Sequence, residues 1–295
     1  MAAAVAVGLP AHASEDAHVL VLGRISDDPN AHYAQLKPLL DYVVPRMREV
    51  GITEGRILMA RDAQQMASYL RRDRVDWVTE TASTAVQLQQ RAAARPLLLT
   101  ERNGVSSYHT VFFVRTENPI RRLGDLAGHT LALQSTASTS AYMVPMTELL
   151  DARLSPEILL APSDVPSPDR VGYVFARSEL NIASWVHKGV VDAGALSSLD
   201  WNDRRRVPEA FRRDFRVVHE SHPYPRALEL VRAGMEPAVE ARLREVLLQA
   251  SQDPAARDAL QLFFNTSRFL ELDPESEQAL QALRTGVQRV RSEVE

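Results

Sequence analysis

Three consecutive hydroxyl residues, Ser138, Thr139 and Ser140, are the first feature of this chain that points to chemistry. They lie between an apolar strand-like segment and an apolar helix-like segment in LALQSTASTSAYMVPMTELLD, residues 131–151. A helix needs only one N-cap residue, so the other hydroxyls are in surplus. The first N–H groups of a helix lack internal acceptors, and the helix dipole makes that end partly positive. The segment therefore predicts an anion site; a simple cap with solvated neighbours is the alternative.

The rest of the chain carries no pattern typical of catalysis. It lacks a G-x-G-x-x-G motif, a P-loop, a G-x-S-x-G turn and an H-E-x-x-H motif. It has no cysteine, which excludes disulfides, zinc–thiolate sites, iron–sulfur clusters and cysteine nucleophiles, and its eight histidines do not cluster at metal-ligand spacing. We therefore expect a non-enzymatic protein without cofactor or metal. A periplasmic hydrolase that uses a serine or a glutamate is the less favoured alternative.

Length and charge indicate the domain organisation and exclude one kind of partner. A chain of 295 residues with 45% hydrophobic and 24% charged residues is globular in composition, and its length favours two domains or lobes. The formal net charge of −4 argues against a nucleic-acid partner, because such proteins usually carry an excess of basic residues.

The N-terminus predicts export. An apolar stretch, residues 2–9, is followed by Pro10 and by Ala11-His12-Ala13, a small-residue cleavage pattern, ahead of polar Ser14. We interpret residues 1–13 as the remnant of a signal peptide, cleaved near Ala13–Ser14, and expect a periplasmic protein. No other window approaches about 18 apolar residues, so the chain is not expected to be embedded in a membrane.

Strand-like and helix-like segments alternate in two blocks, which predicts α/β lobes with mainly parallel sheets. In the first block we expect strands at 18–23, 56–60, 75–80 and 96–101, and helices at 33–50, 63–72 and 82–94. In the second we expect strands at 108–115, 130–133, 171–175, 192–197 and 215–220, and helices at 141–151 and 178–189. A strand at 226–232 and helices at 236–251, 255–264 and 275–294 follow.

Two extended connectors join these blocks, at 96–115 and 215–232. Each is a strand, a short polar break and a second strand, and the second connector precedes helices that return to the first block. The chain is therefore expected to cross between the lobes twice. The predicted lobe 1 comprises residues 14–107 and 222–295, and the predicted lobe 2 comprises residues 108–221.

Several segments resemble the phosphate/phosphite/phosphonate-binding family of periplasmic solute-binding proteins. They are DWVTETASTAVQL, GVSSYHTVFFVR, LGDLAGHTLAL, STASTSAYMVP and NIASWVHKGVVDAGALSSLDWND, and together they extend over nearly the whole mature chain. The element S-T-S-small-Y-x-x-P is the most specific of them. The resemblance implies a two-lobed type II periplasmic-binding fold, with a mostly parallel, helix-flanked sheet in each lobe, a two-strand hinge, and delivery of a ligand to an ABC permease.

The same resemblance assigns site residues. In the family the S-T-S residues grip an oxyanion at the helix start, a role that falls to Ser138, Thr139 and Ser140. The aromatic residue of the first crossing corresponds to Tyr108, and the acidic residue of the later strand to Asp192.

This chain departs from the family pattern at three places. Ala141 stands where a glycine usually follows S-T-S, Ala63 where an aromatic residue is common, and Thr79-Glu80-Thr81 where many members have Gly-Pro or Gly-Asn. These departures leave the oxyanion grip in place and leave the organic part of the ligand open.

Further candidates come from the predicted element ends. Glu80, at a strand end facing the cleft, would accept the proton of a monoprotonated oxyanion or pair with a ligand amine; an exposed glutamate beside a Thr81 cap is the alternative. Asn181 and Ser178, at the start of a helix, would donate from the opposite lobe. Arg24, just after the first strand, would offer a positive charge; a surface role is the alternative.

The sequence thus predicts a periplasmic binding protein that captures a small tetrahedral oxyanion, such as phosphate, phosphite or phosphonate, for an ABC importer. An oxyanion-loaded sensor that docks on a membrane histidine kinase is the alternative.

Overall fold

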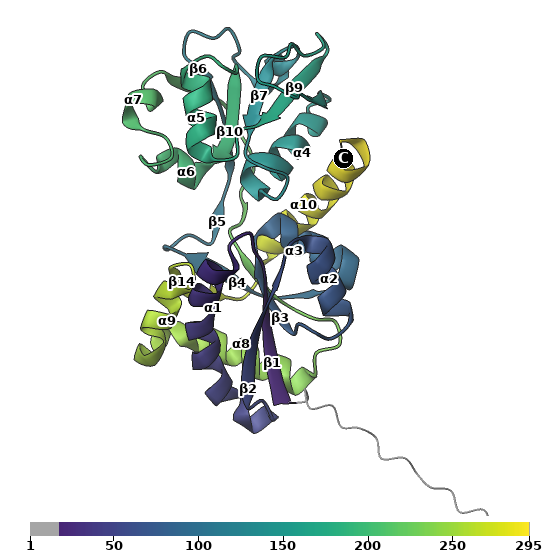
Figure 1. Ribbon diagram of the computed structural model, residues 1–295, viewed down its shortest axis with the longest axis vertical. Coiled ribbons are helices and arrows are strands. Elements are labelled where there is room, and N and C mark those ends of the chain that lie inside the picture. The colour runs from purple at the N-terminus through teal and green to yellow at the C-terminus, as the bar shows by residue number, and fades with distance from the viewer. Residues whose placement is uncertain (1–17, 295) are drawn as a thin grey trace, which may run out of the picture.

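The computed structural model describes residues 18–294 and forms two lobes, each built around a six-stranded sheet (Figure 1). We call the first sheet and its helices lobe 1 and the second sheet and its helices lobe 2. The predicted leader, residues 1–13, and the cleavage position at Ser14 lie outside the described residues. Within the described part, no helix is both long and apolar enough to span a bilayer.

In lobe 1 the strand order is β14-β4-β13-β3-β1-β2. Strand β1 pairs in parallel with β2 and β3, whereas β13 and β14 run antiparallel to their neighbours. The strands are β1 (Val19–Ile25), β2 (Glu54–Ala60), β3 (Trp77–Glu80), β4 (Arg95–Arg102), β13 (Leu228–Val231) and β14 (Thr266–Leu270). The helices are α1 (Pro29–Val43), continued as a 3-10 helix over Val44–Val50, α2 (Ala63–Arg71), α3 (Ala82–Ala92), α8 (Pro237–Gln249) and α9 (Arg257–Leu262), with short 3-10 turns at Ala250–Gln252 and Pro254–Ala256.

In lobe 2 the strand order is β11-β6-β10-β7-β9-β8, and only β6 runs against its neighbours. The strands are β6 (Thr110–Arg115), β7 (Thr130–Leu133), β8 (Ser155–Ile158), β9 (Arg170–Phe175), β10 (Ala193–Ser197) and β11 (Phe215–Glu220). The helices are α4 (Val144–Asp151), preceded by a π-helical turn at Thr139–Met143, α5 (Glu179–His187), α6 (Ser198–Asn202) and α7 (Glu209–Arg212), with a 3-10 turn at Leu123–Leu126.

Both sheets are covered on both faces, because successive strand residues point to opposite sides. In β3, Trp77 packs in one apolar cluster of lobe 1 while Val78 packs in another. In β6, Phe112 and Phe113 divide in the same way. All four side chains are fully buried. The continuous apolar runs in the sequence therefore reflect strands that are buried on two sides, and the predicted α/β class is confirmed.

The lobes are joined by a two-stranded connection. Strand β5 (Ser107–Tyr108) pairs antiparallel with β12 (Tyr224–Pro225), and the rings of Tyr108 and Tyr224 lie 4.8 Å apart between centroids. The predicted two-strand connection is confirmed in this pair, and β5 lies in the narrow region between the lobes (Figure 1).

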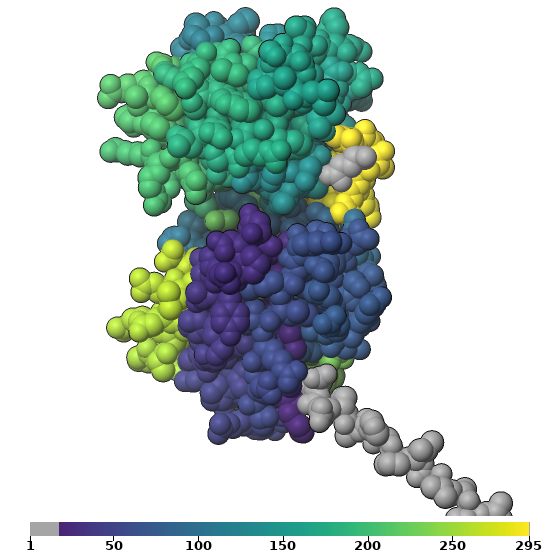
Figure 2. All heavy atoms as spheres, viewed as in Figure 1, coloured from purple at the N-terminus to yellow at the C-terminus, as the bar shows by residue number. Residues whose placement is uncertain are grey.

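Helix α10 (Pro274–Glu293) also bridges the lobes, since it packs on α3 of lobe 1 and α4 of lobe 2 (Figure 2, yellow). A Cβ atom at Gly286 would lie 2.5 Å from the Thr147 side chain, so only glycine allows this approach to α4. Arg289 forms an ion pair with Asp151 of lobe 2. The two lobes are thus held by a hinge on one side and by a helix on another.

Some elements differ from the sequence prediction. Strands β8 and β14 and helices α6 and α7 were not predicted, and the single helix expected at 33–50 is an α-helix followed by a 3-10 helix. Pro45 lacks the N–H that a continued α-helix would need, which explains the change at Val44. The unexpected strand β14 extends the lobe 1 sheet beside β4.

Candidate functional site

The carboxyl ends of β1, β3 and β4 in lobe 1 face the start of the helix that follows β7 in lobe 2. The contact that shows this is made by Thr139, whose Oγ1 accepts the Ser83 N–H at 3.2 Å and lies 2.7 Å from the Ser83 hydroxyl. Ser83 lies in the first turn of α3, so two helix starts meet across the cleft. Ligands of α/β folds bind at such strand ends.

The residues of the S-T-S segment have different partners. The Ser138 hydroxyl accepts the Ala141 N–H at 3.0 Å and is the N-cap. The Thr139 hydroxyl reaches across to Ser83 of lobe 1. The Ser140 carbonyl accepts the Thr110 hydroxyl at 2.9 Å. One hydroxyl therefore caps the helix, a second links it to lobe 1, and the Ser140 backbone links it to β6.

Tyr108 packs against an arginine. The Arg226 guanidinium lies 5.0 Å from the Tyr108 ring centroid. Burial raises the pKa of Tyr108, so the phenol is a neutral donor at physiological pH.

Three arginines lie near one another at the lobe 1 edge of the cleft. Arg24 is in β1, Arg102 ends β4, and Arg226 directly follows the hinge strand β12. The Arg102 residue is 6% exposed and the Arg24 side chain 12% exposed. Burial, followed by repulsion from Arg24 and Arg226, lowers the pKa of Arg102 to about 9. We call these residues the arginine cluster.

Each arginine of the cluster has one N–H donor without a hydrogen-bond acceptor. The Nε atoms of Arg24, Arg102 and Arg226 are buried and have no hydrogen-bond partner in the structure of residues 18–294. A buried donor without an acceptor costs about 1–3 kcal/mol, more when it is charged. Three such donors close together indicate a place for an anion.

Two buried carboxylates stand behind the cluster. Glu80 accepts the Ile25 N–H at 2.8 Å and pairs with Arg24 at 3.2 Å. Glu229 accepts hydrogen bonds from Trp77, Thr79 and Thr100 at 2.5, 2.9 and 2.6 Å. Burial raises the pKa of both carboxyl groups. Three cationic groups thus face at most two anionic ones, and a bound anion would offset the excess.

An aromatic ring positions two of the arginines. The guanidinium of Arg102 lies 4.4 Å from the Phe264 ring centroid, and that of Arg24 lies 5.1 Å from it. Phe264 and Asn265 have φ angles of 55° and 53°, in the left-handed region that bulky residues seldom adopt. Local strain of this kind is found at functional sites, and here it places the ring against the cluster.

Glu80 and Thr81, which were predicted as ligand contacts, lie at the cleft. One Glu80 oxygen accepts the Ile25 N–H and the other pairs with Arg24, so this carboxylate supports Arg24. Thr81 is the N-cap residue of α3, and its side chain makes no capping bond. The role suggested for Glu80, binding a ligand proton or amine, stays a prediction.

The predicted contacts of lobe 2 divide into two groups. Ser178 and Asn181 lie at the start of α5, beyond the carboxyl end of β9, where Ser178 accepts the Asn181 N–H and Asn181 donates to the Ala176 carbonyl. They are on the cleft side of the sheet, but their printed bonds stay within their own turn.

Asp192 lies where two strands of lobe 2 begin. It precedes β10 and accepts the N–H and the hydroxyl of Thr130, the first residue of β7, both at 2.9 Å. The cleft lies at the carboxyl ends of the parallel strands β7 and β10. Asp192 instead hydrogen-bonds Thr130 where these two strands begin, at the opposite end of the sheet. The structure thus places Asp192 at the opposite end of these strands from the S-T-S segment, and its assignment to the ligand site stays a prediction.

The residues that sequence reasoning missed are Arg102, Arg226, Glu229 and Phe264. Arg102 ends the apolar run PLLLTER and Arg226 follows the hinge proline, so each stands where a buried strand or crossing opens toward the cleft. An arginine at the carboxyl end of a buried strand was the available signal. Glu229, a glutamate inside the apolar segment LELV, was another.

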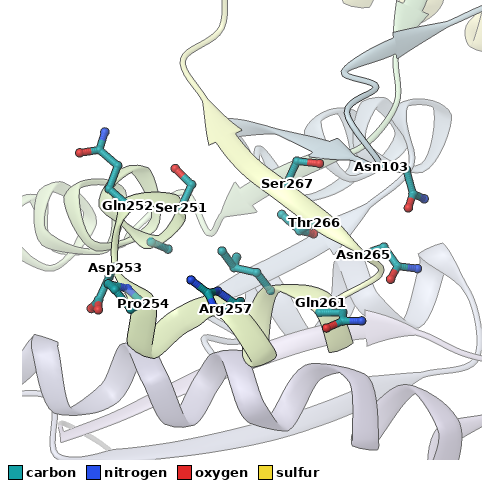
Figure 3. A pocket seen from close by; sticks show the side chains of 12 residues that line it. Asn103, Ser251, Gln252, Asp253, Pro254, Arg257, Gln261, Asn265, Thr266 and Ser267 are labelled. Atoms are coloured by element: carbon teal, nitrogen blue, oxygen red, sulfur yellow. The ribbon is translucent and has the colours of Figure 1, made fainter.

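A separate hollow of about 390 Å³ lies on lobe 1, between α9, β14 and the preceding turns (Figure 3). Its wall includes Asp253, which already binds Tyr42 at 3.0 Å and Arg46 at 2.9 Å. This hollow belongs to lobe 1 alone, away from the S-T-S segment, so it is distinct from the candidate site.

Comparison with known proteins agrees with this geometry. Residues 24–276 match the family model described as ABC transporter, phosphonate, periplasmic substrate-binding protein. Structures of XAC2383 from Xanthomonas citri bound to chloride and to ATP are 59% and 58% identical to this chain; each covers 94% of this chain and 100% of its own, with a TM-score of 0.88.

A more distant structure shares the fold. PhnD1 from Prochlorococcus marinus in complex with methylphosphonate is 16% identical, covers 92% of this chain and 99% of its own, and has a TM-score of 0.63. Because the family model spans most of the sequence, the chain belongs to the periplasmic phosphonate-type substrate-binding proteins of ABC transporters, a family of transport proteins and not of enzymes.

Proposed function

We propose that this protein captures a small tetrahedral oxyanion of the phosphate, phosphite or phosphonate kind between its lobes and presents it to an ABC importer. The observation that carries the proposal is the arginine cluster, with three buried Nε donors that have no partner in the described chain, opposite the start of the helix after β7. Hydrogen bonds between charged donors and phosphoryl oxygens are about twice as strong as neutral ones. The leader assigned to residues 1–13 is part of the same proposal.

The relatives support an anionic ligand without naming it for this chain. XAC2383 was found with chloride and with ATP, and PhnD1 with methylphosphonate. The first two indicate that a closely related chain binds anions and a phosphoryl compound.

A thermal-shift screen tests the proposal directly. Orthophosphate, phosphite, methylphosphonate, sulfate and ATP are added at increasing concentration, and a ligand that binds only the folded state stabilises it by about 2.7 kcal/mol at a hundredfold excess over Kd. We expect phosphorus oxyanions to raise Tm. Unchanged melting with all five compounds would contradict the proposal.

The hydroxyl segment gives a sharper prediction. Thr139→Val or Ser140→Ala is expected to weaken oxyanion binding roughly tenfold to a hundredfold, since each hydrogen bond to a charged oxygen contributes about 1.5–3 kcal/mol. Ser138→Ala is the matched control: it removes the cap on Ala141 N–H, costs about 1 kcal/mol of unfolding free energy and leaves affinity nearly unchanged. Calorimetric titration and denaturant unfolding separate the two effects. Wild-type affinity in both variants, with reduced stability, would make the hydroxyls structural.

A further inference from the structure

Thr110, the first residue of β6, lies where three segments of the chain meet. Its N–H donates to the Ser221 hydroxyl and its carbonyl accepts the Ser221 N–H, both at 3.0 Å, so its backbone is tied to the second connector. Its hydroxyl oxygen lies 2.9 Å from the Ser140 carbonyl of the S-T-S segment and 2.8 Å from the Tyr224 hydroxyl of β12. Thr110 is fully buried and Tyr224 nearly so, and both side-chain bonds are therefore made away from solvent.

The chemistry of these groups fixes the direction of both hydrogen bonds. A carbonyl oxygen can only accept, so the Thr110 hydroxyl donates its single proton to Ser140. The Thr110 oxygen is then left as an acceptor, and the Tyr224 hydroxyl must be the donor. Burial raises the pKa of Tyr224 well above its ordinary value, so the phenol keeps the proton that it donates. The three groups form one hydrogen-bond chain that runs from Tyr224 through Thr110 to Ser140.

The Tyr224 end of this chain is held by the connection between the lobes. Tyr224 pairs with Tyr108 across the two antiparallel strands, and the two rings pack against each other. Both residues are buried. The hydroxyl that donates to Thr110 therefore belongs to a side chain whose position is set by the connecting strands.

The other end of the chain acts on the peptide unit between Ser140 and Ala141. Its carbonyl accepts the Thr110 hydroxyl, and its N–H donates to the Ser138 hydroxyl at 3.0 Å. Because a peptide unit is planar, bonds at both ends fix the rotation of the whole plane. The turn depends on such support, since Ala141, with φ −114° and ψ 20°, departs from helical geometry inside it. The bond from Thr110 thus orients the turn that carries the S-T-S hydroxyls.

We infer that Thr110 is a positioning residue, which acts through Ser140: its hydroxyl transmits the placement of Tyr224 to the S-T-S segment and holds that segment in the geometry that grips an oxyanion. This assignment rests on the proposed function of the segment. It adds that oxyanion affinity depends on a hydroxyl outside the set of ligand contacts. Contact residues need to be held within about 0.5 Å of their working positions, and supporting hydrogen bonds do this.

Three variants of the chain test the assignment by calorimetric titration with orthophosphate, phosphite and methylphosphonate. Thr110→Val keeps the branched shape but removes the hydroxyl, and should weaken binding roughly tenfold, about the effect of one misplaced donor to a charged oxygen. Thr110→Ser restores the hydroxyl and should bind within about twofold of wild type. Tyr224→Phe keeps the ring but removes the donor that fixes the Thr110 oxygen, and should weaken binding roughly threefold.

Thr116→Val and Tyr42→Phe are the matched controls. The Thr116 hydroxyl donates to the Asp214 carbonyl at 3.0 Å, just beyond the other end of β6. The Tyr42 hydroxyl donates to Asp253 at 3.0 Å in lobe 1. Each control loses a hydroxyl bond away from the S-T-S segment, so denaturant unfolding can show a loss of stability while the affinities stay at wild-type values.

The outcomes distinguish this assignment from the proposed function. Wild-type affinity in Thr110→Val, or a loss that Thr110→Ser does not restore, would overturn the assignment, whereas binding by the wild type keeps the proposed function. If Thr110→Val does not fold, Tyr224→Phe decides, and wild-type affinity in that variant would overturn the assignment. Failure of the wild type to bind all three oxyanions would instead contradict the proposed function, and the assignment with it.

Discussion

Replacement of Arg102 by methionine is expected to weaken oxyanion binding by at least about a hundredfold while leaving the unfolding free energy unchanged or higher. The affinity falls because the variant loses the buried guanidinium charge and its unpartnered Nε donor, and a hydrogen bond between charged groups contributes about 1.5–3 kcal/mol. Stability does not fall, because the pKa of Arg102 is lowered to about 9: burial and two neighbouring arginines disfavour the charged form in the native state. Methionine also keeps an apolar contact with Phe264.

Calorimetric titration measures the affinity and denaturant unfolding the stability. Arg268→Met, on the adjacent strand β14, is the matched control, since Arg268 pairs with Glu101 at 3.1 Å away from the cleft. Wild-type affinity in the Arg102 variant would contradict the proposal that the arginine cluster binds the ligand. A loss of several kcal/mol of stability would show instead that Arg102 chiefly compensates the buried carboxylates.

At Glu229 we expect the main effect of substitution to be on stability and not on affinity. Glu229→Ala should lower the unfolding free energy by about 3–5 kcal/mol. The reason is that the Trp77 indole N–H and two threonine hydroxyls lose their acceptor, and the buried charge of Arg102 loses a nearby carboxylate. Conservative Glu229→Gln keeps the shape and one acceptor oxygen, so its loss should be smaller. Denaturant unfolding of both variants measures the difference. An alanine variant as stable as wild type would mean that the buried donors find other partners.

The same residue predicts a pH dependence of stability. Burial raises the pKa of Glu229 above its unfolded value, so its contribution is fully present below the unfolded pKa, about 4.3, and is lost as pH rises through the native pKa. Glu229→Gln lacks this titration. The unfolding free energy of the variant should therefore fall less than that of the wild type as pH rises above about 4.3, measured by denaturant unfolding across that range.

Local signals were enough to predict most of the fold. The apolar runs at β1, β3 and β4, each followed by a helical period, set the α/β alternation, and the hydroxyls of Ser138–Ser140 marked the helix start that faces lobe 1. Strand β14 escaped notice because Thr266–Leu270 is short, half exposed, and follows two left-handed residues at the end of a helical pattern.

The arginine cluster could be predicted only in part. Arg24 was a candidate because it follows the apolar run of the first strand, whereas Arg102 and Arg226 lie far from it in sequence and resemble surface arginines until the fold brings the three together. For Asp192 too the sequence says less than the fold: a resemblance transfers a residue to a strand, whereas a contact with ligand depends on which end of that strand faces the cleft. Its bonds to Thr130 place it at the starting end.

The position of β13 in the sheet has a consequence for the order in which the chain folds. Strand β13 lies between β3 and β4, yet all of β6 to β11 separates it from them along the chain. Lobe 2 can form from one continuous stretch, whereas β3 and β4 keep unpaired facing edges until Leu228–Val231 emerges. Domains fold as units during synthesis, and pairings between residues far apart in sequence form slowly. We therefore expect lobe 2 to fold before β13 completes the sheet of lobe 1.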